Sequence, residues 1–125
     1  MTTSLKASAL GGVAAVIANL VVFFWGNVPQ TVLTPFGRPI NAVAVIAVTF
    51  SPVFLAGAVF YALSDRFWAY RALVILLTLA SLVTPFGIEG APGTMVVTLL
   101  VMHLVAGGAA AFLVPRIAET LAEED

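Results

Sequence analysis

The chain contains no cysteine, and charged residues make up only 9% of its 125 positions. The lack of cysteine excludes disulfides, thiol catalysis and cysteine-ligated metal clusters. A soluble domain usually carries about 25% charged and about 45–50% apolar residues, whereas 62% of this chain is hydrophobic. The composition therefore excludes a water-soluble globule and predicts a membrane protein.

Several function classes lack the residues that they need. The net charge of −1 gives nucleic acid no electrostatic reason to bind, so we expect no nucleic-acid partner. A catalytic zinc ion needs about three protein ligands, and the chain has a single histidine, His103. Glycine-rich phosphate-binding motifs are also absent. We therefore expect neither a bound metal nor another cofactor.

Four long apolar runs cover most of the chain, at about residues 5–25, 40–63, 67–84 and 94–114. Each run is close to the roughly 20 residues that a transmembrane helix needs, and a membrane barrel would instead show alternating segments of about 10 residues. Pro115 marks the end of the last run and leaves residues 115–125 as a short acidic tail. The sequence predicts an all-α fold, with residues 1–125 forming one antiparallel bundle of four transmembrane helices.

The distribution of positive charge predicts the orientation of this bundle. Four spans place both termini and the loop after the second helix on one side of the membrane. That side would carry Lys6, Arg66, Arg71 and Arg116, and the other side only Arg38. The positive-inside rule then predicts a multi-pass protein of the plasma membrane with both termini in the cytoplasm.

Polar side chains inside the predicted spans are few, and none of the central ones is Asp, Glu, Lys or Arg. At about 1.5 Å of rise per residue, one polar residue from each helix falls about 10–13 Å below the outer helix ends. The layer fits a polar pocket open toward the outer leaflet, since an intramembrane ionisable residue is a candidate functional site. It equally fits a purely structural role, in which His103 donates a hydrogen bond to Asn19 or Thr49 and so holds the helices together. The candidate binding residues of the layer are Asn19, Thr49, Ser51, Thr78, Ser81 and His103.

A tetrapeptide occurs twice on the predicted outer side, at 34–37 and at 84–87, each time as Thr-Pro-Phe-Gly. The similarity does not extend along the neighbouring helices, which favours shared loop chemistry or chance over a duplication. Arg38 and Glu89 follow the two copies and are the only charges expected on this side. They are candidates to pair across the mouth of the bundle or to contact a substrate head group, and a solvated pair worth about 0–1 kcal/mol is the simpler alternative.

Small residues recur at helical spacing on three of the predicted helices. Close packing of small residues is how membrane helices associate, because lipid offers no hydrophobic driving force between them. Each stripe can pack within one chain or between protomers, and the sequence leaves both open. The stripes are Ser8, Gly12, Ala15 and Asn19; Ser51, Leu55, Ala58 and Ala62; and His103, Gly107 and Ala110.

The stretch from about Asn41 to Ile117 resembles a known family. The more specific part is the run Met-His-Leu-Val at 102–105, preceded by Ser-Leu at 81–82 and by Pro85. The family consists of small bacterial membrane proteins with four helices, best represented in actinobacteria, and has no known function. The resemblance implies the four-helix fold and directs attention to His103, Ser81 and Pro85, but it implies no reaction.

Three kinds of function fit these observations. We expect an accessory or hydrophobic-ligand-binding bundle, whose partners are the lipid bilayer and a lipophilic small molecule, a second copy or a larger membrane protein. The first alternative is a membrane-embedded isomerase, cyclase or hydrolase of a lipophilic substrate, with His103 as general acid and base. The second is a small transporter subunit, although the usual intramembrane carboxylate is missing.

Two structural features would separate the first two of these functions. An enzyme predicts that His103, Asn19 and a hydroxyl converge on one cavity. An accessory protein predicts a stripe of small residues left uncovered on the outside of the monomer.

Overall fold

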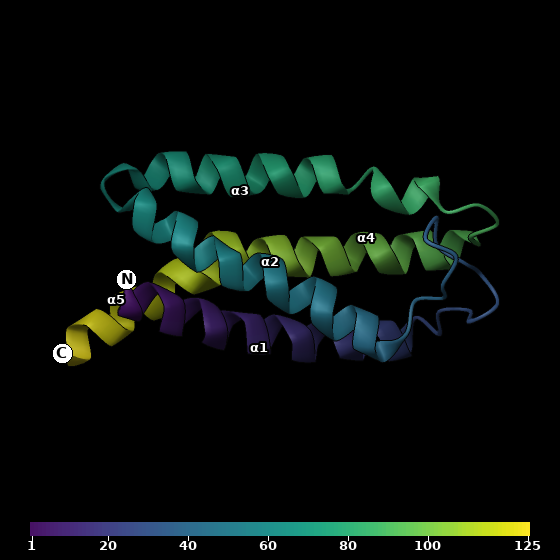
Figure 1. The fold of residues 1–125 in the computed structure, drawn as a ribbon, viewed down its shortest axis with the longest axis horizontal. Coiled ribbons are helices and arrows are strands. Elements are labelled where there is room, and N and C mark those ends of the chain that lie inside the picture. The colour runs from purple at the N-terminus through teal and green to yellow at the C-terminus, as the bar shows by residue number, and fades with distance from the viewer.

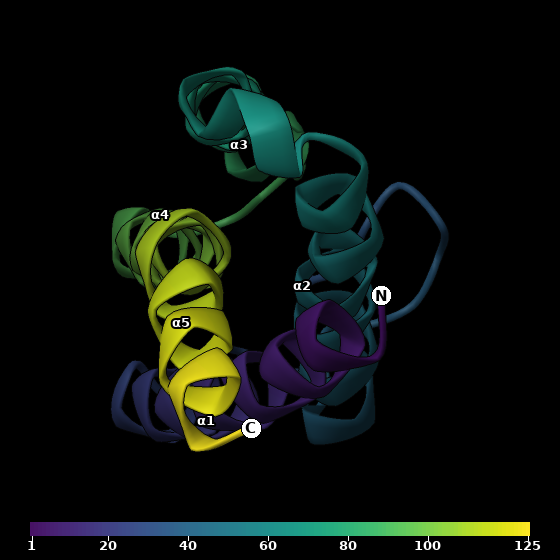
Figure 2. The ribbon, with the colours of Figure 1, turned by 90° about the vertical axis from the view of Figure 1, so that its left-hand side faces the viewer.

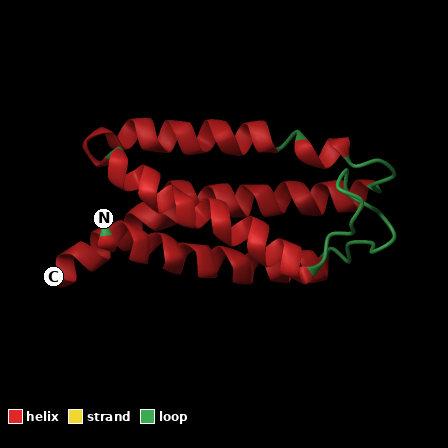
Figure 3. Ribbon diagram, in the orientation of Figure 1, coloured by secondary structure: helices red, strands yellow, loops and turns green.

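The computed structural model describes residues 1–125, and all of its regular elements are helices (Figure 3). Two short 3₁₀ segments, η1 (Ser64–Arg66) and η2 (Thr84–Gly87), flank the third long helix. The segment 26–41 is a loop with one isolated bridge between Leu33 and Pro39. The long helices are α1 (Thr2–Trp25), α2 (Ala42–Ala62), α3 (Phe67–Ser81) and α4 (Gly93–Gly108).

Four helical stretches are long and apolar enough to cross a membrane, which confirms the predicted fold class. They run alternately in opposite directions, and both chain termini lie at the same end (Figure 1). We call this the terminal end, and the opposite end, where segments 26–41 and 88–92 connect the helices, the loop end. A lipid bilayer is the environment that these helices indicate.

The fourth stretch does not end at Pro115, so the predicted helix end is wrong. Helix α4 continues through a π-helical segment, η3 (Ala109–Leu113), into α5 (Val114–Glu124). Proline inside a helix removes one N–H and clashes with the carbonyl four residues earlier. The wider π turn directly before Pro115 changes the hydrogen-bond register there, and the chain stays helical. The predicted acidic tail is therefore mostly the exposed side of an amphipathic helix.

Helix α1 is the centre of the packing, and α3 lies farthest from it (Figure 2). Both α2 and the α4–α5 stretch pack against α1, whereas α3 contacts α2, α4 and η3. The small-residue stripe of α1 is buried in these contacts. At Gly57 of α2, a Cβ atom would collide with the side chain of Ser8 and with the carbonyl oxygen of Ser4. The absence of a side chain at Gly57 is therefore what lets the two helices approach.

The other two stripes meet different surroundings. The stripe on α4 faces α3, because a Cβ atom at Gly107 would collide with the side chain of Thr78. The stripe on α2 is left uncovered, with all four of its residues exposed: Ser51, Leu55, Ala58 and Ala62.

Candidate functional site

The predicted polar layer divides into two separate ties between helices. One is centred on Asn19 of α1 and the other on His103 of α4. No hydrogen bond joins Asn19 or Thr49 to His103. The expectation that His103 donates to Asn19 or Thr49 is therefore wrong.

Asn19 joins three helices through its side-chain amide. It is only 2% exposed, and its Nδ2 atom donates to Thr49 Oγ1 of α2 at 3.0 Å and to the Met102 carbonyl oxygen of α4 at 3.1 Å. The Oδ1 atom is buried and has no hydrogen-bond partner. The amide therefore acts as a double donor that holds α1, α2 and α4 at one level.

His103 joins α4 to the segment after α3. Its Nδ1 atom lies 2.6 Å from the Leu99 carbonyl oxygen, and its Nε2 atom lies 3.2 Å from Thr84 Oγ1 in η2. Because a carbonyl can only accept, Nδ1 carries the proton of this bond. Met102 and His103 are adjacent, and successive helical residues point about 100° apart. This explains why the backbone of Met102 meets Asn19 while the ring of His103 turns toward η2.

The remaining predicted hydroxyls bond locally. Thr78 Oγ1 donates to the Val74 carbonyl at 2.8 Å, and Ser81 Oγ donates to the Thr78 carbonyl at 2.6 Å. Such bonds to the preceding turn are common for Ser and Thr in membrane helices. Ser51 is exposed on α2 and has no hydrogen-bond partner. The structure therefore does not gather these hydroxyls around His103.

Arg38 and Glu89 lie at the loop end, in the two connecting segments. Both are exposed, and no ion pair joins them. The contact that would close the mouth of the bundle is absent.

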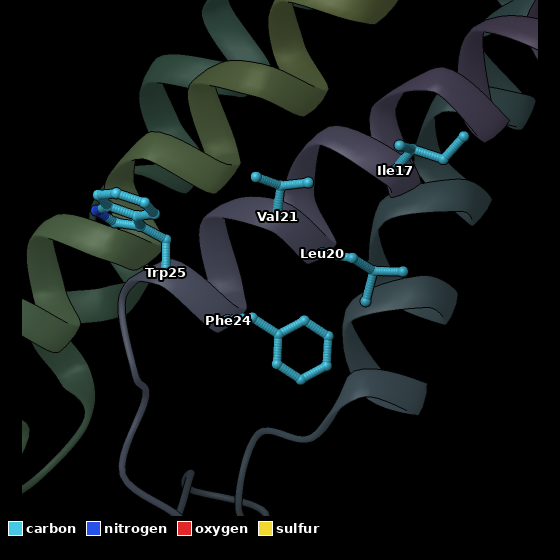
Figure 4. Close-up of a pocket in the computed structure, with 5 residues that line it drawn as sticks. All are labelled: Ile17, Leu20, Val21, Phe24 and Trp25. Carbon is cyan, nitrogen blue, oxygen red and sulfur yellow. The ribbon is translucent and has the colours of Figure 1, made fainter.

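Two surface hollows, each of about 560 Å³, are lined by none of the predicted site residues. One is an open apolar groove along the half of α1 nearer the loop end, whose side chains are shown in Figure 4. The other lies at the loop end, where Trp25 and Gly26 approach the start of α4. No group of three or more potential metal-ligating side chains is present. The first hollow is lined by Ile17, Leu20, Val21, Phe24 and Trp25.

The sequence analysis missed a polar contact at the terminal end, between α3 and η3. Tyr70 is completely buried, and its hydroxyl donates to the carbonyl oxygen of Ala110. That carbonyl lacks a backbone donor, because the N–H of Val114 goes to Ala109 and Pro115 has no N–H. Pro115 was the available signal, since a proline that follows an unbroken apolar run can lie within the helix as well as end it.

Arg71 takes part in the same contact. Its Nε atom donates to the carbonyl oxygen of Ala111 at 3.4 Å. In a regular α-helix this carbonyl would accept from residue 115, which is the proline. Two neighbouring side chains of α3 thus satisfy two carbonyls of the π segment.

Comparison with known proteins identifies the family of this chain. No curated protein and no solved structure matches it. The model of one family of unknown function matches residues 1–123. This match extends beyond the resemblance at 41–117 to include α1 and the loop at 26–41. The chain, with its four apolar helices and their polar ties, therefore belongs to the family of unknown function DUF6069.

Proposed function

We propose that the protein is a small accessory membrane protein that acts by helix–helix association, and that the associating surface is the exposed stripe of α2. The observation that carries this proposal is the contrast among the three stripes. Those of α1 and α4 are used within the chain, whereas Ser51, Leu55, Ala58 and Ala62 are all exposed. Small residues on a lipid-facing helix allow a second backbone to approach closely.

The polar groups of this face support the same proposal. Ser51 is exposed and its hydroxyl is unpaired. Pro52, inside α2, has no N–H to donate to the carbonyl of Val48, and both residues are exposed on the same side. An unsatisfied backbone group in the hydrocarbon region costs several kcal/mol. A partner helix that supplies a donor and an acceptor here would remove this cost.

The occupant that best fits is a second copy of the chain. A two-fold interface must be self-complementary, and this face carries one donor and one acceptor about a turn apart. Each Ser51 hydroxyl can donate to the Val48 carbonyl of the other copy, and the alanines let the two α2 helices pack closely. With the orientation that the positive charges predict, both copies have their termini in the cytoplasm.

Cysteine cross-linking in membranes tests the association. The chain has no cysteine of its own, so Ala58→Cys introduces a single thiol on the proposed interface. We expect oxidation to produce a disulfide-linked dimer, because a disulfide forms where Cα atoms lie about 4.4–6.8 Å apart. The matched control is Leu76→Cys, at a position on α3 that is also exposed, which should stay monomeric.

The results of cross-linking distinguish a second copy of the chain from a different protein bound to this face of α2. Adding Ala62→Phe to the Ala58→Cys variant should suppress the dimer if the stripe is the interface. Equal cross-linking at positions 58 and 76, or none at 58, would overturn the proposal. A disulfide at 58 to a different protein would assign the face to a larger partner and exclude the second copy.

A second candidate function is a membrane-embedded hydrolase, which the contact between His103 and Thr84 favours. Thr84 is exposed, and the imidazole beside it is oriented by the Leu99 carbonyl. A hydroxyl, a base and a group that orients the base are the parts of an activated nucleophile. Thr84 Oγ1 donates its one proton to the Ser81 carbonyl oxygen at 2.7 Å, so the hydroxyl must first turn toward Nε2. Attack of Thr84 Oγ1 on a fluorophosphonate probe would then form an oxygen–phosphorus bond, release fluoride and pass the hydroxyl proton to Nε2.

Labelling of Thr84 distinguishes catalysis from a purely structural tie. An enzyme should show probe attachment at Thr84 that is lost in His103→Ala. Modification of Thr84 at the same slow rate in both proteins, or none at all, would exclude the hydrolase.

A further inference from the structure

We propose that Arg71 is the centre of a binding site for the phosphate group of an anionic phospholipid at the terminal end of the bundle. The site lies between α3 and η3, away from the exposed face of α2. It goes beyond the proposed function and does not depend on it.

The guanidinium of Arg71 is held in place by three contacts. Its central carbon lies 4.5 Å from the centre of the Phe67 ring and 4.8 Å from that of the Phe112 ring. Its Nε atom donates to the Ala111 carbonyl oxygen at 3.4 Å. Aromatic faces attract a cation, and more strongly where water is excluded. The guanidinium of Arg71 is therefore fixed in orientation before any ligand binds.

The charge of this guanidinium has no counter-ion. The chain forms no ion pair, and the only protein hydrogen bond of the Arg71 side chain is the one from Nε. An arginine side chain has five N–H donors in a rigid fork, so the four on the Nη atoms remain free. This fork matches two oxygens of a phosphate or carboxylate, and a positive charge beside apolar side chains is strongly stabilised by an anion.

The position of Arg71 along the helix indicates a lipid as the source of the anion. The membrane-spanning stretch begins at Ser64, and seven residues of helix place the Arg71 Cα about 10 Å inside it. The contact with Phe67, one turn closer to the terminal end, shows that the side chain reaches back toward that end. Long cationic side chains extend in this way to the head-group region.

Exposed aromatic residues mark the same level of the bundle. Tyr61 and Trp68 are 50% and 75% exposed near the terminal end. Tyr and Trp are enriched where a membrane helix meets the head groups. A phosphate at this level belongs to a lipid of the surrounding leaflet, and anionic lipids are attracted by basic residues next to a span.

Lipid retention by the purified full-length protein tests the site. Native mass spectrometry in detergent would compare added phosphatidylglycerol with phosphatidylcholine of the same acyl chains. We expect the wild type to retain phosphatidylglycerol preferentially and Arg71→Gln to bind it roughly tenfold more weakly. Arg71→Lys should also lose most of the preference, because lysine keeps the charge but lacks the planar fork.

The matched control is Arg66→Gln, which removes the same charge from an exposed position on η1. It should retain the wild-type preference. An equal loss in Arg66→Gln, or wild-type retention in Arg71→Gln, would overturn the proposal. Full displacement of the lipid by inorganic phosphate would assign the site to free phosphate instead.

A further variant keeps the test valid if Arg71→Gln fails to fold. Phe112→Leu retains the charge and removes one of the two rings that hold it. It should weaken phosphatidylglycerol binding with no effect on phosphatidylcholine. An unchanged preference for phosphatidylglycerol in this variant would overturn the proposal that the two rings orient the Arg71 guanidinium for phosphate binding.

Discussion

Gly57→Ala is expected to lower the free energy of unfolding by about 1–3 kcal/mol, the usual cost of adding a methyl group to a packed interior. The new methyl group would meet the Ser8 side chain and, at 2.8 Å, the carbonyl oxygen of Ser4. A backbone atom cannot rotate away, so α1 and α2 must separate. The measurement is unfolding of the purified protein by titrating a denaturing detergent into a mild one, followed by circular dichroism.

Gly108→Ala is the matched control for this substitution. Gly108 also lies within a helical stretch, but nothing lies within 4 Å of a Cβ atom built there. We expect this variant to be more stable by about 0.5–1 kcal/mol, because alanine has the better helix propensity. Equal effects of the two substitutions would show that the contact between α1 and α2 does not depend on the size of residue 57.

Asn19→Ala is expected to lower the free energy of unfolding by about 2 kcal/mol. Two buried hydrogen bonds are lost, to Thr49 and to the Met102 carbonyl, and bonds between membrane helices average about 0.6 kcal/mol each. The space left by the amide adds a cavity cost. The same detergent titration measures the effect.

Ser81→Ala serves as the control for Asn19. Ser81 also lies within an apolar stretch, but its hydroxyl bonds only to the Thr78 carbonyl of its own helix. Its removal should change the stability by less than about 0.6 kcal/mol. If Asn19→Ala were no more destabilising than Ser81→Ala, Asn19 would not be the main polar tie among α1, α2 and α4.

The three proline-dependent features of this chain show one physical principle at work. A proline in a membrane helix frees a carbonyl, which then needs a donor from elsewhere. At Pro115 the protein supplies the donors itself, from Tyr70 and Arg71. At Pro52 it supplies none, which is why α2 is the face that we propose for association. At Pro85 the carbonyl four residues earlier is that of Ser81, and it accepts a hydrogen bond from Thr84 Oγ1 at 2.7 Å.

Much of the fold could be predicted from the sequence because its cause is local. A run of about 20 apolar residues is long enough to cross a bilayer as a helix and lacks the alternation of a membrane barrel, so the four runs by themselves predict four helices. The stripes of small residues also follow from helical periodicity. Which stripe is covered depends on how the helices are arranged, and no single helix contains that information.

The candidate site was less predictable, because depth along a helix says nothing about the direction of a side chain around it. Asn19 and His103 were placed correctly within apolar helices, yet they bond to different partners. The repeated tetrapeptide makes the same point. At 34–37 it forms a turn with Gly37 at a positive φ of 75°, and at 84–87 it forms the 3₁₀ segment η2, two turn residues after α3 ends.

The sequence by itself thus determined that this is a four-helix membrane protein with few polar groups in its helices, since these properties depend on residue type and spacing. Only the tertiary structure decided that the polar layer divides in two, that α2 keeps an uncovered face, and that Arg71 is held without a counter-ion. Each of these depends on the rotation and separation of helices distant in sequence. Those quantities are set by the packing of all the helices together.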